Sequence, residues 1–264
     1  MKNILVPVGS KESGINNLQY AINFAAMSGA KVYVINIYKA FSKVGGLTKV
    51  NQLMMDDSEA LLDDLLSHVD TKGIDVISKP IQGDPFEAIS RISKQLNIDL
   101  LILSPQSVEK RDEVYLGRIT GKIVKQTSIP LLIVPKDCVF RKVETILLAF
   151  KRGYFEKDNV LVPLKEMAQL FNSKINLLHV ITPDVVDDKT PMDRELLAMQ
   201  SSFKVTENAT VFQGILEHFQ SHHPDMLCVL RRRRGFFQKL LEKNTVLKKE
   251  FHTSKPLLIL KGQE

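Results

Sequence analysis

The stretch at residues 100–135, LLILSPQSVEKRDEVYLGRITGKIVKQTSIPLLIVP, predicts two buried strands joined by a polar loop and a short helix. The apolar runs at residues 99–103 and 130–134 are of strand length and show no helical period. Residues 116–126 between them space their apolar side chains as an amphipathic helix does. A strand, a crossover helix and a second buried strand form the repeating unit of a parallel sheet.

A second stretch near the end of the chain repeats this pattern. Residues 226–261 read MLCVLRRRRGFFQKLLEKNTVLKKEFHTSKPLLILK, so the two strands recur 126 residues later. The segment KVYVINI at residues 31–37 has a similar counterpart in KINLLHVI at residues 174–181. Self-similarity on this scale indicates a tandem duplication of one domain.

The rest of the first repeat predicts alternating strands and helices. Further strands are expected at residues 2–7, 31–37 and 75–80, and helices at residues 13–28, 51–69 and 86–96. The helix at residues 13–28 is predicted to bury Ile15, Leu18, Ala21, Ile22, Ala25 and Ala26. Pro80 removes a ladder donor, which places the third strand near a sheet edge. Apolar strands that alternate with amphipathic helices indicate a parallel sheet covered on both faces.

The sequence therefore predicts the α/β fold class, with two tandem doubly wound parallel-sheet domains at residues 1–138 and 141–264. The offset between matching strands falls from 142 residues at the start of the repeats to 126 at their end. The second domain is thus shorter, mostly around its second helix and third strand. Its first two helices are expected at residues 157–171 and around residues 195–202.

Composition excludes several classes of protein. The 264 residues are 44% hydrophobic and 25% charged, which is an ordinary globular composition. No apolar run approaches the roughly 20 residues that cross a bilayer, and the start, MKNILVPVGS, lacks a signal-peptide core. We therefore expect a cytoplasmic protein without a membrane partner. Cys138 and Cys228 lie far apart without a CxxC spacing, which argues against a redox or zinc site.

Three motifs resemble those of the universal stress protein family. They are the ILVP opening at residues 4–7, the helix start GDPFEAI at residues 83–89, and the strand–loop–Gly–helix–PLLIVP ending. The resemblance covers nearly the whole chain as two domains and implies an adenine-nucleotide-binding-like fold. Domains of this family pair through their last strands, so residues 130–134 are expected beside residues 256–260. Such pairing can be internal to a tandem chain, and the resemblance also leaves room for a homodimer.

The resemblance also implies where a nucleotide would bind. Family members that bind ATP carry a loop of the form G-x2-G-x9-G-[S/T] before the last helix, and an Asp after the first strand. Glycines in such a loop let backbone N–H groups approach phosphate oxygens, and the helix N-terminus adds partial positive charge. This chain has Ser104 and Ser107 at the first two glycine positions, Gly117 at the third, Arg118 at the Ser/Thr position and Gly9 at the Asp position. Two hypotheses follow: the loop is degenerate, or its hydroxyl groups and Arg118 still hold phosphate.

The corresponding loop of the second domain contains four consecutive arginines, residues 231–234. Arg231 and Arg234 stand at the glycine positions and form a candidate anion site, followed by Phe236 and Phe237. Basic and aromatic side chains together suit single-stranded nucleic acid. The alternative is a charged surface loop with an amphipathic helix behind it. Because a net charge of +6 is a small excess, we expect no nucleic-acid partner.

The chain shows no catalytic signature. There is no nucleophile elbow, no GxxxxGK[ST] loop and no Ser-His-Asp pattern. His218 and His222 are i, i+4 on one expected helix, but no third ligand lies at metal-binding spacing, so surface histidines are expected. The favoured function is a non-catalytic, regulatory or protective role in stress response with a degenerate nucleotide site. The alternatives are an ATP-binding stress protein that uses the first domain only, and polyanion or RNA binding through the arginine loop.

Overall fold

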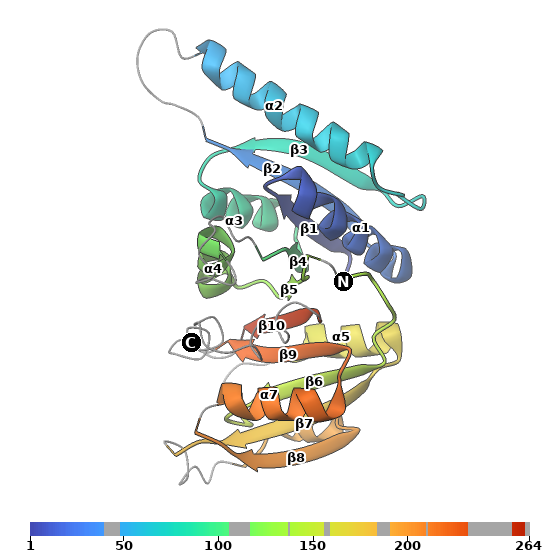
Figure 1. Cartoon of the computed structure of the whole chain (residues 1–264), viewed down its shortest axis with the longest axis vertical. Helices are drawn as coiled ribbons and strands as arrows, with labels where there is room; N and C mark the ends of the chain where they lie inside the picture. Colours follow the sequence, from blue (N-terminus) through green and yellow to red (C-terminus); the bar gives the residue numbers. More distant parts are fainter. Residues whose placement is uncertain are drawn as a thin grey trace. The chain divides into compact units, whose positions relative to one another are not determined.

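The computed structural model describes residues 1–39, 48–105, 117–136, 138–155, 159–183, 191–209, 211–231 and 255–261. Its contacts divide the chain into two compact units. Figure 1 shows helices and strands alternating along the sequence in both units. In the part of the chain that is described, no helix is long and apolar enough to cross a membrane.

The described part of the first unit has four strands and four helices, in the predicted order (Figure 1). The strands are β1 (Asn3–Val8), β2 (Lys31–Tyr38), β3 (Val76–Gln82) and β4 (Leu100–Leu103). The helices are α1 (Lys11–Ser28), α2 (Thr48–Ser67), α3 (Pro85–Gln95) and α4 (Gly117–Gln126). The strands pair in parallel in the order β3-β2-β1-β4. The third strand is therefore at the edge, as Pro80 predicts.

Local sequence explains the end of α1 and the start of α3. Helix α1 ends at Gly29, which adopts the left-handed conformation with a φ of 68° and donates its N–H to the Ala25 carbonyl. Glycine is the residue that takes this conformation at the lowest cost. Helix α3 begins after Asp84, whose carboxylate accepts the N–H groups of Phe86 and Glu87, with Pro85 in the first turn. The observed end of α1 and start of α3 lie close to those of the helices expected at residues 13–28 and 86–96.

The second unit has six strands and three helices in its described part. The strands are β5 (Leu131–Ile133), β6 (Thr145–Phe150), β7 (Lys174–Ile181), β8 (Ser202–Glu207), β9 (Met226–Arg231) and β10 (Leu257–Lys261). The helices are α5 (Val162–Phe171), α6 (Arg194–Ala198) and α7 (Val211–His222). The strand order is β5-β10-β9-β6-β7-β8. All of these pairs are parallel except β5 with β10.

The last strand of the first repeat belongs to this second unit. Strand β5 runs antiparallel to β10, with Leu132 opposite Leu258 and both side chains fully buried. The contacts thus group β5 with the second repeat, although it precedes residue 138, where the first predicted domain ends. Pairing through buried leucines removes a sheet edge that would otherwise be exposed.

One predicted helix boundary in the second unit is wrong. The helix expected at residues 157–171 begins only at Val162. Pro163 stands in its first turn, where the missing N–H of proline costs no helical hydrogen bond. A helix that began several residues earlier would bring the proline ring against the preceding turn. Asn159 has a φ of 69°, which also lies outside the helical region.

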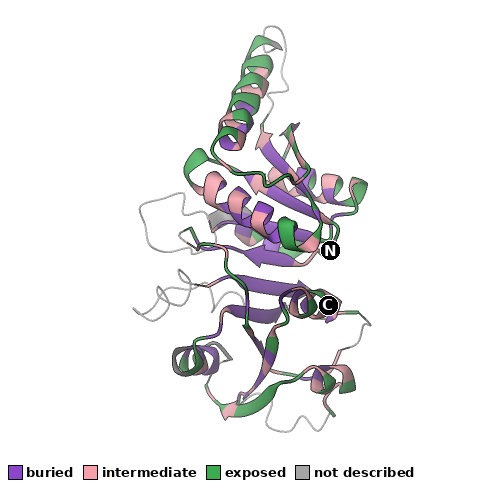
Figure 2. Ribbon diagram, turned by 90° about the vertical axis from the view of Figure 1, so that its right-hand side faces the viewer, coloured by how far each residue is buried: buried purple, intermediate pink, exposed green. Residues whose placement is uncertain are grey.

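The shortening of the second repeat is concentrated in one helix. Helix α6 has five residues, whereas its counterpart α2 has 20. Strand β8, which follows α6 in the chain, is exposed along nearly its whole length, including Phe203 and Val205, whereas most other strands are buried (Figure 2). The second unit therefore has a less covered sheet at this edge.

Candidate functional site

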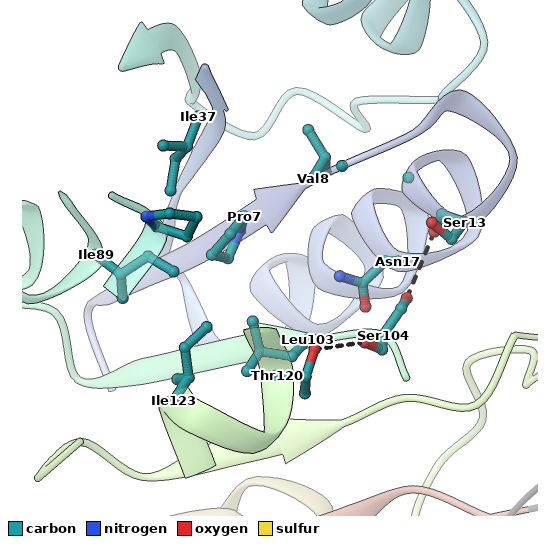
Figure 3. A pocket seen from close by; sticks show the side chains of 13 residues that line it. Pro7, Val8, Ser13, Asn17, Ile37, Ile89, Leu103, Ser104, Thr120 and Ile123 are labelled. Carbon is teal, nitrogen blue, oxygen red and sulfur yellow. Dashed lines mark hydrogen bonds between the residues drawn. The ribbon is translucent and has the colours of Figure 1, made fainter. Parts of the chain in front are cut away.

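A crevice opens in the first unit at the carboxyl ends of β1 and β4 (Figure 3). Strand β1 lies between β2 and β4, so the chain leaves neighbouring strands in opposite directions at this point. Open α/β sheets bind ligands at such a reversal of strand order. The crevice has a volume of about 80 Å³. Its lining consists of Pro7, Val8, Gly9, Ser13, Gly14, Asn17, Ile37, Pro85, Ile89, Leu103, Ser104, Thr120 and Ile123.

Hydroxyl groups on one side of the crevice bond to backbone carbonyls. Ser104 Oγ lies 3.5 Å from the Ser13 carbonyl oxygen, and Thr120 Oγ1 lies 3.3 Å from the Ser104 carbonyl oxygen (Figure 3). Both hydroxyls donate in these contacts, which are long for O–H···O bonds. These two hydrogen bonds connect helix α4 to the end of β4, and the end of β4 to the start of α1. The hydroxyl protons of Ser104 and Thr120 therefore point toward protein atoms.

Asn17 is the most buried polar residue of the crevice wall. Its side chain is 1% exposed and extends from α1 toward Leu103 and Ser104 (Figure 3). Asn17 Nδ2 donates to the Ile102 carbonyl at 3.2 Å. Asn17 Oδ1 has no hydrogen-bond partner among the residues that the structure describes. Buried polar atoms are nearly always paired, so this acceptor stands out.

The crevice wall carries no ionisable side chain, because none of its thirteen lining residues is an acid, a base, a cysteine or a tyrosine. Two charged groups nearby in sequence pair with carboxylates that are not lining residues: Lys11 Nζ lies 2.8 Å from Asp64 Oδ2 on α2. Lys122 Nζ lies 3.5 Å from Asp84 Oδ1. The described wall of the crevice is therefore electrically neutral.

The structure brings two of the residues predicted for the phosphate loop to this crevice. Gly9 follows β1 and Ser104 follows β4, and both are lining residues. Gly117 begins α4 and Arg118 is its second residue, whereas Ser107 lies outside the described residues.

Sequence reasoning missed three polar lining residues of the crevice, Ser13, Asn17 and Thr120. The sequence does contain a sign of Asn17, because this polar residue lies next to Leu18 on the buried stripe of α1. A polar side chain on a buried stripe calls for a hydrogen-bond partner and often marks a site.

Two rings stack near the corresponding position of the second unit. At the carboxyl end of β6, the Phe150 ring stacks on the His179 imidazole, with centroids 5.3 Å apart and planes at 13°. His179 Nε2 also lies 3.0 Å from the Lys151 carbonyl oxygen. Arg231 ends β9, and Arg234 lies outside the described residues. The anion site proposed for these two arginines stays a prediction.

The histidines of α7 pair with each other and with a lysine. The imidazoles of His218 and His222 stack with centroids 3.9 Å apart, and Lys204 Nζ lies 2.9 Å from His222 Nε2. Desolvation, together with the nearby His222 and Lys204, lowers the pKa of His218 to about 4. Among the described residues there is no group of three or more His, Cys, Asp or Glu side chains that could hold a metal.

Comparisons with known proteins agree on one family. The sequence pattern of the universal stress protein family matches residues 1–135. A universal stress protein of Methanocaldococcus jannaschii is 19% identical over 140 residues, which cover 51% of this chain and 82% of that protein. The crystal structure of a universal stress protein from Archaeoglobus fulgidus has a TM-score of 0.72 at 16% identity and covers 98% of both chains, so the shared fold extends over the second half. The chain belongs to the universal stress protein family.

Proposed function

We propose that this protein is a regulatory or protective binding protein, that it is not an enzyme, and that its nucleotide site is degenerate. A role in stress response follows from its family. The observation that carries the proposal is the neutral crevice of the first unit, whose thirteen lining residues include no ionisable side chain.

The neutral wall argues against catalysis at this position. General acid–base catalysis needs an ionisable group within hydrogen-bond reach of the reacting atoms. A phosphate group needs cationic side chains or several backbone N–H groups at close approach. The side chains of the described wall offer only hydroxyl groups and the Asn17 amide as polar groups, and two of those hydroxyls already donate to carbonyls. The Cβ of Ser104 also limits the close backbone approach that a glycine would allow.

The second candidate is an ATP-binding protein that uses the first domain only. The position of the crevice at the reversal of strand order favours it, because ligands of α/β sheets bind there. Gly9, Ser104, Ser107, Gly117 and Arg118 would then be the nucleotide-binding residues.

Thermal unfolding of the full chain with and without magnesium ATP separates the two candidates. A ligand at a hundred times its dissociation constant stabilises the folded state by about 2.7 kcal/mol, which moves the unfolding midpoint by several degrees. We expect no shift at millimolar ATP and no release of phosphate above the buffer rate. A midpoint that rises with ATP concentration would favour the second candidate.

We also propose tandem domains at residues 1–138 and 141–264 that pair internally through their last strands in a cytoplasmic protein. The antiparallel pairing of β5 with β10 supports this, since each strand is the last of its repeat. An internal pairing leaves these strands unavailable to a second copy, so a homodimer would need another surface. Sedimentation velocity of the full chain and of a Leu132→Asp variant tests the proposal: loss of folding in the variant supports it, and a folded variant with unchanged sedimentation contradicts it.

A further inference from the structure

Strand β8 leaves an open edge on the sheet of the second unit. Among the described strands it pairs with β7 alone, and it stands last in the strand order (Figure 1). We propose that two copies of this chain associate through this edge, with their β8 strands antiparallel and the two Val205 residues opposite each other. The inference rests on the proposed internal pairing of the repeats, which occupies β5 and β10 and leaves a homodimer in need of another surface.

The side chains of β8 are largely exposed to solvent. Five of its six residues are exposed, with exposed fractions of 38% for Phe203 and 51% for Val205. Successive side chains of a strand point to opposite faces, so these two apolar side chains share one face. The helix that precedes β8, α6, has five residues whereas its counterpart α2 has 20, so little helix is available to cover them.

The edge lacks the features that usually keep strands apart. Proteins protect edge strands with proline or with lysine side chains. The edge strand of the first unit, β3, contains Pro80, which has no N–H to donate, whereas β8 contains no proline. The one lysine of β8, Lys204, has its Nζ 2.9 Å from His222 Nε2 on α7, so its ammonium group is directed toward a helix of its own unit. The backbone of β8 is therefore open to a further strand.

The sequence of β8 suits pairing with a second copy of itself. Its one positive and one negative side chain, Lys204 and Glu207, cancel, so two β8 strands carry no net charge to repel each other. In antiparallel pairing with two-fold symmetry about Val205, Lys204 lies opposite the partner's Thr206. Phe203 lies opposite the partner's Glu207 and diagonal to the partner's Val205, within reach of an aromatic ring. Symmetry about Lys204 would instead set two ammonium groups directly opposite, which is destabilising.

Sedimentation velocity of the full chain over a range of concentrations measures the association. A pair of six-residue strands is small beside the roughly 1,200–2,000 Å² of a standard interface, so we expect a reversible dimer. Val205→Lys sets two positive charges opposite each other and should raise the dissociation constant about tenfold or more. The matched control is Ile77→Lys on β3, the same change at an apolar side chain that is 41% exposed, and it should leave the dissociation constant unchanged.

A mixture of two variants tests the register. Val205→Lys and Val205→Glu should each dimerise poorly alone, because each sets like charges opposite each other. Mixed together, they place opposite charges at the two-fold axis and should recover the association. Such recovery also shows that both variants are folded and competent to pair.

A chain that stays monomeric at every concentration would overturn the inference, even if β8 binds a strand of a different protein. A dimer that Val205→Lys leaves unchanged, or a mixture that does not associate, would overturn it as well. The internal pairing of the repeats fails separately. A folded Leu132→Asp chain with unchanged sedimentation contradicts that pairing, whereas an intact dimer of Val205→Lys contradicts only the β8 interface.

Discussion

Asp99 and Asp225 make the same hydrogen bonds at matching places in the two units. Each carboxylate Oδ2 accepts two backbone N–H groups at the start of the first strand of its own repeat, β1 for Asp99 and β6 for Asp225. The distances are 2.6 and 3.0 Å for Asp99, and 3.0 and 2.9 Å for Asp225. The two residues are 126 positions apart, which is the offset of the strands that follow them. The duplication has thus preserved an anchor between the first strand and the strand beside it.

Replacing either aspartate by asparagine should destabilise the protein. The change keeps one acceptor oxygen but removes the negative charge, and hydrogen bonds to charged groups contribute about 1.5–3 kcal/mol. We expect Asp99→Asn and Asp225→Asn each to lower the free energy of unfolding in urea by about 1–2 kcal/mol. The control is Asp75→Asn, since Asp75 forms an exposed ion pair with Lys31 at 3.2 Å, a type that contributes about 0–1 kcal/mol. An equal loss in the control would contradict the anchoring role.

Gly214 lies where α7 packs tightly against Val180 of β7. A Cβ at Gly214 would lie 2.9 Å from Val180 Cγ1 and 3.0 Å from Val180 Cγ2. Because valine is stiff at χ1, Gly214→Ala should force the helix away from the strand and cost about 1–3 kcal/mol in thermal or urea unfolding. Gly121→Ala in α4 is the matched control, with no atom within 4 Å of its Cβ. It should stabilise by about 0.5–1 kcal/mol through helix propensity, and destabilisation by both variants would refute the contact argument.

The cap of α3 should depend on pH. Hydrogen bonds from the Glu87 and Phe86 N–H groups, with a smaller effect of Lys122, hold the pKa of Asp84 below its ordinary value of 3.8. Since the folded-state pKa is the lower one, the stabilisation is present above pH 3.8 and is lost as the pH falls through the folded-state pKa. Asp84→Ala should cost about 1 kcal/mol at pH 7 and progressively less as the pH is lowered below 4. Urea unfolding at several pH values measures this, and a constant difference down to pH 2 would disagree with it.

The pKa of the His218 imidazole should lie far below that of an ordinary histidine. Its pKa of about 4 in the folded state lies under the usual 6.5, so the unfolded chain binds more protons between these values. This residue should therefore reduce stability as the pH falls from 6.5 to 4 and add no further change below that. Lys204→Met removes a nearby positive charge and should raise the pKa of His218, as measured from imidazole proton shifts in NMR. An unchanged value in the variant would show that burial and the neighbouring His222 set the pKa without Lys204.

The order of elements was predictable because its signals are local. Apolar runs, helical spacing and caps such as Asp84 act over a few residues, and the observed bounds of α3 and β7 agree closely with those expected. The boundary at Val162 was missed because Pro163 was read as part of a continuing helix rather than as its start. The family resemblance, read from three motifs, is confirmed by the match over residues 1–135.

The crevice was only partly predictable, because helix rotation depends on contacts between distant elements. The expected stripe of α1 included Ala26, which is exposed, and omitted Gly14 and Asn17, which are buried. A Cβ at Gly14 would lie 2.9 Å from Leu65 Cδ2, so the absence of a side chain there lets α2 approach and sets the face that α1 buries. Gly14 and Leu65 are about fifty positions apart, so their contact leaves no pattern in the local sequence of α1.

The most direct test of the central claim is calorimetric titration of the full chain with magnesium ATP, beside a variant that restores the family's nucleotide-binding pattern. That variant combines Gly9→Asp, Ser104→Gly, Ser107→Gly and Arg118→Ser. The neutral crevice predicts no saturable heat for the unmodified chain at millimolar ATP, and a binding isotherm for a folded restored variant. A saturable isotherm of the unmodified chain, with one ATP per molecule, would contradict the account.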